Sequence, residues 1–178
     1  MSKSITVLGT GYVGLVSGVG LADFGNTVTG VDINLSIVDR LNKGEPTIYE
    51  HGLRDYLERN VESGRLTFTT NAADAVAGAD VVFIAVGTPE SPDGSADLSQ
   101  VKTVVATIAE HATGHTVVVT KSTVPVGTNR WIAGEFARLA PNKDISVASN
   151  PEFLREGRAV QDFFHPDRLV IGCEDEST

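Results

Sequence analysis

Two periods of hydrophobic and polar residues alternate along the chain. Short runs of apolar, β-branched residues are separated by longer stretches in which apolar residues recur at helical spacing. The runs predict strands at residues 5–8, 27–31, 66–69, 81–86, 116–120, 145–148 and 169–171. The stretches between them predict helices at residues 12–24, 36–42, 53–62, 72–77, 98–111, 128–139 and 158–163. This alternation is typical of an α/β fold, so we expect a doubly wound, mostly parallel sheet of the Rossmann type with helices on both faces.

Two predicted helices begin at residues that can cap their first turn. Asp97 with Gln100 fits a capping box, and Asn71 with Asp74 is a weaker relative of one. Two connections, residues 44–52 and 87–96, are long and polar. The second leaves the carboxyl end of a predicted strand, where doubly wound sheets bind ligands, so we expect it to contribute to a site. Its glycines and prolines would equally suit a loop in solvent.

Composition limits the class of protein. With 178 residues, 41% of them hydrophobic, and no linker rich in Gly, Ser or Pro, the chain suits one soluble domain. A net charge of -9 argues against nucleic acid as a partner. The sequence contains no leader-like segment and no apolar run long enough to span a membrane, so we expect a cytoplasmic protein without a membrane partner.

Cysteine and histidine give little support for a metal site. Cys173 is the single cysteine, which excludes an internal disulfide framework and a site with several cysteine ligands. His111 and His115 are four residues apart, but Gly114 between them is typical of a helix end, where histidine complements the helix dipole. We therefore predict no metal.

A glycine motif lies between the first predicted strand and the first predicted helix. It reads Gly9-Thr10-Gly11-Tyr12-Val13-Gly14. In this context the first glycine permits a sharp turn, the second permits close approach of a pyrophosphate, and the third permits packing of helix on strand. The pyrophosphate would lie at the helix N-terminus, which favours anions. The motif therefore predicts a dinucleotide site.

An acidic residue then favours NAD over NADP. Asp32 ends the second predicted strand, close to the distance from the glycines at which a carboxylate accepts hydrogen bonds from the adenosine ribose. The same carboxylate would repel a 2′-phosphate. We therefore expect NAD as the cofactor.

Two polar segments, residues 121–127 and 150–157, follow predicted strands and should open on the cofactor side of the sheet. A hydroxyl from Thr123 and a carboxylate from Glu152 could hold a water between them, as base-assisted attack requires. Alternatively, Thr123 caps the next helix and Glu152 is simply solvated. The spacing alone does not favour one of these interpretations over the other.

Positive charges gather in the same region, at Lys121, Arg155, Arg158 and Arg168. They could hold a phosphorylated substrate against the acidic background, or they are ordinary surface residues. Several other chemistries are excluded, because the sequence contains no Tyr-x-x-x-Lys pair, no G-x-S-x-G elbow, no P-loop and no H-E-x-x-H motif.

Together these segments resemble the N-terminal half of the UDP-glucose 6-dehydrogenase family, within the wider group of nucleotide-sugar dehydrogenases. The resemblance covers essentially the whole chain. It rests on residues 9–15, 48–50, 52–53, 86–89, 93–99, 121–128, 150–157 and 165–168, of which 150–157 is the most specific. Family members usually have proline where this chain has His51, a difference that removes no charge the chemistry needs.

The resemblance implies a two-step oxidation of UDP-glucose to UDP-glucuronate for polysaccharide biosynthesis, with reduction of two NAD⁺. By position, Glu152 resembles the general base that activates the hydrolytic water, and Thr123 resembles the hydroxyl that positions it. Thr88 and Thr123 would lie along the cofactor, together with the glycine motif and Asp32. The residues implied to border the sugar nucleotide are Glu152, Phe153, Leu154 and Arg155.

The family's nucleophilic cysteine, its lysine and asparagine near the substrate, and its long linking helix lie downstream of this domain. Cys173 lacks the motif that surrounds that cysteine and is no substitute. We therefore expect residues 1–178 to be the NAD-binding domain of a homodimeric parent enzyme, which binds NAD without turnover on its own. The alternatives are a GDP-mannose or UDP-N-acetylhexosamine 6-dehydrogenase, or a free-standing NAD-sensing module.

Overall fold

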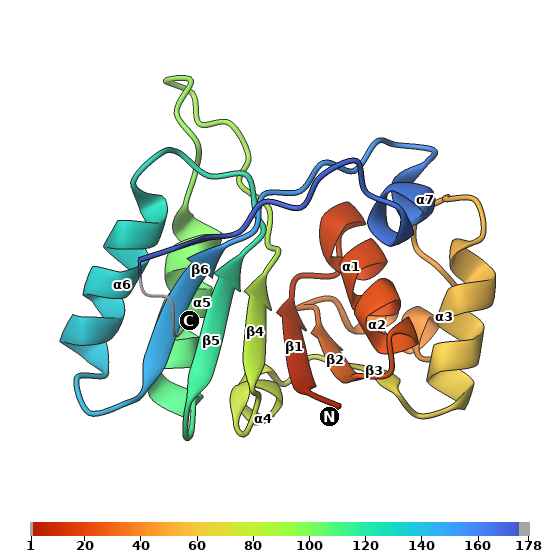
Figure 1. Ribbon diagram of the computed structural model, residues 1–178, viewed down its shortest axis with the longest axis horizontal. Helices are drawn as coiled ribbons and strands as arrows, with labels where there is room; N and C mark the ends of the chain where they lie inside the picture. Colours follow the sequence, from red (N-terminus) through yellow and green to blue (C-terminus); the bar gives the residue numbers. More distant parts are fainter. Residues whose placement is uncertain (1, 175–178) are drawn as a thin grey trace.

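A single sheet organises the chain, as the sequence pattern predicts. The computed structural model describes residues 2–174. The strands in this part are β1 (Ser4–Leu8), β2 (Thr27–Val31), β3 (Leu66–Thr69), β4 (Val81–Ile84), β5 (Thr116–Thr120), β6 (Ile145–Ser149) and β7 (Gly172–Cys173). Their order is β3-β2-β1-β4-β5-β6-β7, with β1 to β6 parallel and β7 antiparallel to β6 (Figure 1). The doubly wound, mostly parallel α/β fold is confirmed.

Helices connect the strands and cover both faces of the sheet. They are α1 (Tyr12–Asp23), α2 (Leu35–Leu41), α3 (Leu53–Glu62), α4 (Ala72–Val76), α5 (Ser99–His111), α6 (Thr128–Leu139) and α7 (Ala159–Phe164). Each predicted helix agrees with the structure to within one residue at either end. As Figure 1 shows, α1, α3 and α7 gather on the part of the sheet formed by β1 to β3.

Adjacent residues of β1 show how both faces are buried. Val7 belongs to the apolar cluster beneath α1 and α3, whereas Leu8 belongs to the cluster beneath α5 and α6. Because successive side chains of a strand point to opposite faces, one strand contributes to two cores. Burying each such side chain stabilises the fold by about 1.5–3 kcal/mol. The central strands thus provide a rigid base for the loops at their carboxyl ends.

The last strand differs from its prediction. Residues 169–171 form no strand, and β7 begins only at Gly172, opposite Ser149 at the end of β6. The side-chain amide of Asn150 donates to the carbonyl of Val170 at 2.9 Å, so a side chain takes the acceptor that a ladder would use. The apolar run therefore passes the end of β6 as an irregular segment before it pairs.

One predicted cap is wrong and the other is confirmed. The carboxylate of Asp97 accepts from the amide of Ser99 at 2.8 Å, and Leu98 is the N-cap residue of α5, so Asp97 and Gln100 form no capping box. At α4 the side chain of Asn71 accepts from the amide of Asp74, as a cap should.

The two long connections take different shapes. Residues 87–96 fold back on themselves through a bridge between Glu90 and Ala96, and the tip of this loop projects away from the sheet (Figure 1). Residues 44–52 instead turn into α3 through Gly52, whose φ of 79° lies in the left-handed region. The turn places the buried side chain of Glu50 directly before α3.

Candidate functional site

The glycine motif forms the turn between β1 and α1. A Cβ atom at Gly9, where φ is 99°, would lie 2.6 Å from the carbonyl oxygen of Ala85, and one at Gly14 would lie 1.9 Å from that of Gly9. A Cβ at Gly11, in contrast, would meet no atom within 4 Å. Gly11 is also the N-cap residue of α1 and provides no side-chain cap. The turn thus has open space beside uncapped amides, which fits a pyrophosphate.

The predicted ribose ligand is held at the end of β2. One carboxylate oxygen of Asp32 accepts from the Thr10 hydroxyl at 2.6 Å, and the other accepts from the Asn34 amide at 2.9 Å. Both donors are neutral, so they orient the carboxylate without neutralising its charge. Each oxygen keeps a lone pair, which suits the diol of a ribose better than a 2′-phosphate.

Thr88 and Thr123 are brought together by the sheet. The Thr88 hydroxyl donates to the carbonyl of Thr123 at 2.7 Å, which joins the loop after β4 to the loop after β5. The proposed capping role of Thr123 is wrong, because the N-cap residue of α6 is Gly127. The Thr123 side chain is exposed and remains free to act elsewhere.

Glu152 lies between two cavities at the ends of β5 and β6. A cavity of about 410 Å³ is lined by both Thr123 and Glu152, the pair predicted to hold a water. A larger cavity of about 730 Å³ is lined by Glu152 together with Phe153, Leu154 and Arg155, the residues predicted to border a sugar nucleotide. One oxygen of Glu152 accepts from the Leu154 amide at 2.7 Å, so the carboxylate is oriented rather than merely solvated.

A buried lysine lies beside Glu152. Lys121 is 7% exposed, lines both cavities, and donates to the side-chain oxygen of Asn150 at 2.8 Å. Burial lowers the pKa of the Lys121 ammonium, and the negative charge of Glu152 opposes part of that shift. Lys121 thus places an amino group inside the site rather than on its surface.

The other predicted cations are already engaged within the chain. Arg155 forms a two-pronged ion pair with Asp162, with its shorter nitrogen–oxygen distance at 2.6 Å, and this hydrogen bonding lowers the pKa of Asp162 to about 2. Arg158 bonds to Gln161 at 3.1 Å, and the guanidinium of Arg168 lies 5.4 Å from the ring centre of Phe153. A phosphorylated substrate would have to compete with these contacts.

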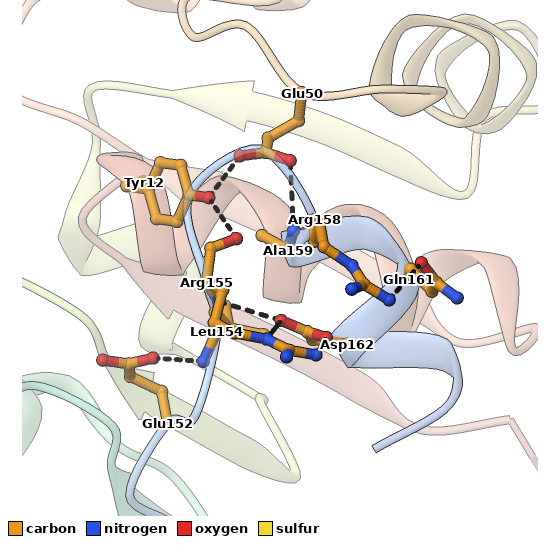
Figure 2. Close-up of polar contacts among 9 residues, drawn as sticks. All are labelled: Tyr12, Glu50, Glu152, Leu154, Arg155, Arg158, Ala159, Gln161 and Asp162. Carbon is orange, nitrogen blue, oxygen red and sulfur yellow. Dashed lines mark hydrogen bonds and ion pairs between the residues drawn. The ribbon is translucent and has the colours of Figure 1, made fainter. Parts of the chain in front are cut away.

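A contact that was not predicted from the sequence joins the glycine motif to residues 152–157. The hydroxyl of Tyr12, the first residue of α1, lies within hydrogen-bonding distance of the Glu50 carboxylate and 3.1 Å from the carbonyl of Arg155 (Figure 2). Burial and the adjacent Glu50 raise the pKa of the Tyr12 phenol well above its usual range, which keeps it a donor. The one local signal was the position of Glu50 in a motif of the family that the sequence resembles.

The comparisons with known proteins identify the family. Residues 3–178 match the UDP-glucose/GDP-mannose dehydrogenase family, NAD binding domain. The chain belongs to this family. UDP-glucose 6-dehydrogenase YwqF of Bacillus subtilis is 53% identical over 176 residues, which are 98% of this chain and 40% of that protein. UDP-glucose 6-dehydrogenase of Rhizobium meliloti is 53% identical over 171 residues, which are 96% of this chain and 39% of that protein.

Solved structures of this dehydrogenase family share the fold of the NAD-binding domain. A UDP-glucose dehydrogenase from the hyperthermophilic archaeon Pyrobaculum islandicum has a TM-score of 0.95 at 51% identity, covering 99% of this chain and 42% of that one. A ternary complex of GDP-mannose dehydrogenase from Pseudomonas aeruginosa has a TM-score of 0.93 at 37% identity, covering 98% and 42%. The chain therefore spans about two fifths of the length of these relatives.

Two further observations complete the site. Within residues 2–174, no group of three or more His, Cys, Asp and Glu side chains is arranged to hold a metal ion. None of the helices described here is both long and apolar enough to cross a bilayer. Cys173 is exposed in β7 and lines neither cavity that contains Glu152.

Proposed function

We propose that the chain is the NAD-binding part of a UDP-glucose 6-dehydrogenase, which oxidises UDP-glucose to UDP-glucuronate with two NAD⁺. The observation that carries the proposal is that Thr123 and Glu152 line one cavity at the carboxyl ends of β5 and β6. Relatives named as UDP-glucose 6-dehydrogenases at 53% identity support the choice of substrate. The proposal extends to a cytoplasmic, homodimeric parent enzyme.

The residues of the chain divide the work of binding. Uncapped amides at the start of α1, around Gly11, Tyr12 and Val13, bind the pyrophosphate, and Asp32 accepts hydrogen bonds from the adenosine ribose. Thr88 lies along the cofactor, next to Thr123. Bound NAD⁺ would supply the hydride acceptor for oxidation at the sugar C6 carbon. Phe153, Leu154 and Arg155 border the sugar nucleotide in the larger cavity.

Glu152 and Thr123 act in the hydrolytic step. The Leu154 amide holds Oε2 of Glu152 and so orients the carboxylate, and we assign the proton taken from water to Oε1. The Thr123 hydroxyl holds that water against the acyl group that the family's cysteine carries. Because Cys173 lines neither cavity that contains Glu152, we propose that residues 1–178 alone bind NAD⁺ without turnover.

A second candidate function is oxidation of a different nucleotide sugar. The GDP-mannose dehydrogenase from Pseudomonas aeruginosa shares the fold at 37% identity, so a GDP-mannose or UDP-N-acetylhexosamine substrate is the alternative. A free-standing NAD-sensing module is the third possibility, but a sensor has no evident use for the pair of Thr123 and Glu152.

Calorimetric titration and a substrate panel test these proposals. We expect the 178-residue chain to bind NAD⁺ and to produce no NADH with UDP-glucose. The whole protein that contains it should form two NADH per UDP-glucose and turn over GDP-mannose and UDP-N-acetylhexosamines far more slowly. Absence of NAD⁺ binding, or steady NADH production by the chain alone, contradicts the proposal. A reading frame that ends at residue 178 would favour the sensing module.

A further inference from the structure

The segment that carries Glu152 has no regular structure of its own. Residues 151–155 lie between β6 and the turn that leads into α7, and they belong to no helix or strand. Backbone groups in such a segment need other partners, and those partners decide its shape. Here the Arg155 amide donates to the carboxylate of Asp162 at 3.0 Å, and one distant carboxylate holds the residues that follow, in the turn and at the start of α7.

That carboxylate belongs to Glu50. Its Oε1 accepts from the Gly157 amide at 2.6 Å. Its Oε2 accepts from the Ala159 amide at 3.0 Å, and the Tyr12 hydroxyl donates to the same carboxylate (Figure 2). Glu50 is 6% exposed. A buried carboxylate persists only with such donors, and hydrogen bonds to an ionised group are about twice as strong as neutral ones.

The backbone of Glu50 is itself held by packed elements. The Leu53 amide at the start of α3 donates to the carbonyl of Glu50 at 3.2 Å, and α3 packs against α1. Helix α7 also lies on α1, where a Cβ at Gly20 would be 2.1 Å from the ring of Phe163. Glu50 therefore lies where three packed helices meet, which fixes its oxygens in place.

From this geometry we infer that Glu50 is the positioning residue for the segment from Glu152 to Arg155, and that Tyr12 links this segment to the cofactor helix. The carboxylate of Glu50 reaches no cavity assigned to cofactor or substrate, so it acts through the segment and not on the reacting atoms. Glu50 fixes the amides of residues 157 and 159, at the C-terminal end of the loop. Glu152 lies near the N-terminal end of the same loop. The effect that we expect of Glu50 on the kinetics rests on the proposed function, whereas its effect on the shape of the segment does not.

Asp23 provides a matched control. It is the last residue of α1, and its carboxylate accepts three hydrogen bonds as that of Glu50 does, although here all come from side chains, two from Arg59 and one from Asn60. Asp23→Asn thus removes the charge of a similarly bonded carboxylate without touching residues 150–159. A merely destabilising effect of Glu50→Gln would be reproduced by Asp23→Asn.

The test combines hydrogen exchange with kinetics in the whole protein. In Glu50→Gln we expect the amides of residues 152–159 to exchange about tenfold faster, because one backbone amide then faces an NH₂ group. We expect kcat to fall about tenfold or more and KM for UDP-glucose to rise, while KM for NAD⁺ changes less than about threefold. Tyr12→Phe, which removes one donor, should speed exchange in the same segment by a smaller factor.

Each outcome decides the inference. Unchanged exchange of residues 152–159 in Glu50→Gln overturns it, as does a loss of kcat that Asp23→Asn matches at equal thermal stability. If Glu50→Gln does not fold, Tyr12→Phe carries the exchange test alone, and unchanged exchange there overturns the inference. A wild-type protein inactive on every nucleotide sugar refutes the proposed function, and the exchange result then still decides whether Glu50 orders the segment.

Discussion

A Cβ atom at Gly14 would lie 1.9 Å from the carbonyl oxygen of Gly9, so the first turn of α1 can lie against the end of β1 only without side chains at these positions. Gly11, between them, faces open space. The three glycines of one motif therefore serve two purposes. Gly9 and Gly14 are required by the fold, and Gly11 leaves room for a ligand.

Alanine substitutions separate these two purposes. We expect Gly14→Ala to lower the free energy of unfolding by about 1–3 kcal/mol or more, since its neighbour is backbone and cannot rotate away. Gly11→Ala should change stability by less than about 1 kcal/mol, yet weaken NAD⁺ binding about tenfold or more, because the new methyl group takes the space of the pyrophosphate. Urea denaturation and calorimetric titration measure the two effects.

The control lies in the comparison of the two variants. Gly134 lies inside helix α6 and has no atom within 4 Å of a Cβ, so Gly134→Ala gives the effect of the same substitution in a helix without a clash. If Gly11→Ala binds NAD⁺ as the wild type does, the pyrophosphate does not approach this backbone, and the assignment of the site is wrong.

Features of the fold and the site that follow from short sequence patterns were predictable, whereas features that depend on residues far apart in the sequence were not. The glycine turn, the strand before it and Asp32 follow from short patterns, and the structure places them as expected. The strand predicted at residues 169–171 failed because a side chain distant in sequence, Asn150, takes the carbonyl of Val170. The contact of Glu50 with residues 157 and 159 spans more than a hundred positions, and no local period encodes it.

Asp32 is expected to set the choice between NAD and NADP. Asp32→Asn keeps an oxygen for the Thr10 hydroxyl but removes the charge. Since hydrogen bonds to charged groups contribute about 1.5–3 kcal/mol, we expect NAD⁺ affinity to fall about tenfold to a hundredfold. The preference over NADP⁺ should narrow because the repulsion of the 2′-phosphate is lost. Parallel titrations with both nucleotides measure the ratio, and an unchanged ratio would show that Asp32 does not face the ribose.

The ion pair of Arg155 and Asp162 should make stability depend on acid pH. The pKa of Asp162 is lowered from 3.8 to about 2 in the folded state. Because the folded pKa lies below the unfolded one, the ionised carboxylate of Asp162 stabilises the fold above about pH 4, and this stabilisation is lost as the pH falls through 2. The Arg155 side chain is 58% exposed, so solvent screens the ion pair. We therefore expect the pair to contribute about 1 kcal/mol to the free energy of unfolding, roughly half of what the pKa shift alone would give.

Asp162→Asn tests this expectation. Its loss of stability relative to wild type should be full at pH 7 and should shrink between pH 4 and pH 2, as measured by urea midpoints. Glu135→Gln, which breaks the exposed pair with Arg138, serves as the control and should cause a smaller loss. A difference for Asp162→Asn that does not vary with pH would mean that the carboxylate contributes by packing alone.

The phenol of Tyr12 gives a spectroscopic prediction. Its pKa is raised first by burial and then by the hydrogen bond and charge of Glu50, so the hydroxyl should still be protonated at about pH 11, where a free tyrosine is mostly ionised. Because the folded pKa lies above the unfolded one, the stability that it contributes is present below pH 10 and is lost as the pH rises further. Tyrosinate absorbance of wild type minus Tyr12→Phe isolates this group from Tyr49 and Tyr56.

The same titration separates the two causes of the raised pKa. In Glu50→Gln the charge of the neighbour is lost but the burial remains, so the pKa of Tyr12 should fall without returning to its ordinary value. Asp23→Asn, at the far end of α1, should leave it unchanged. Ionisation of Tyr12 near pH 10 in the wild type would mean that the phenol is not held against Glu50, and the link from the cofactor helix to the segment of Glu152 would then be absent.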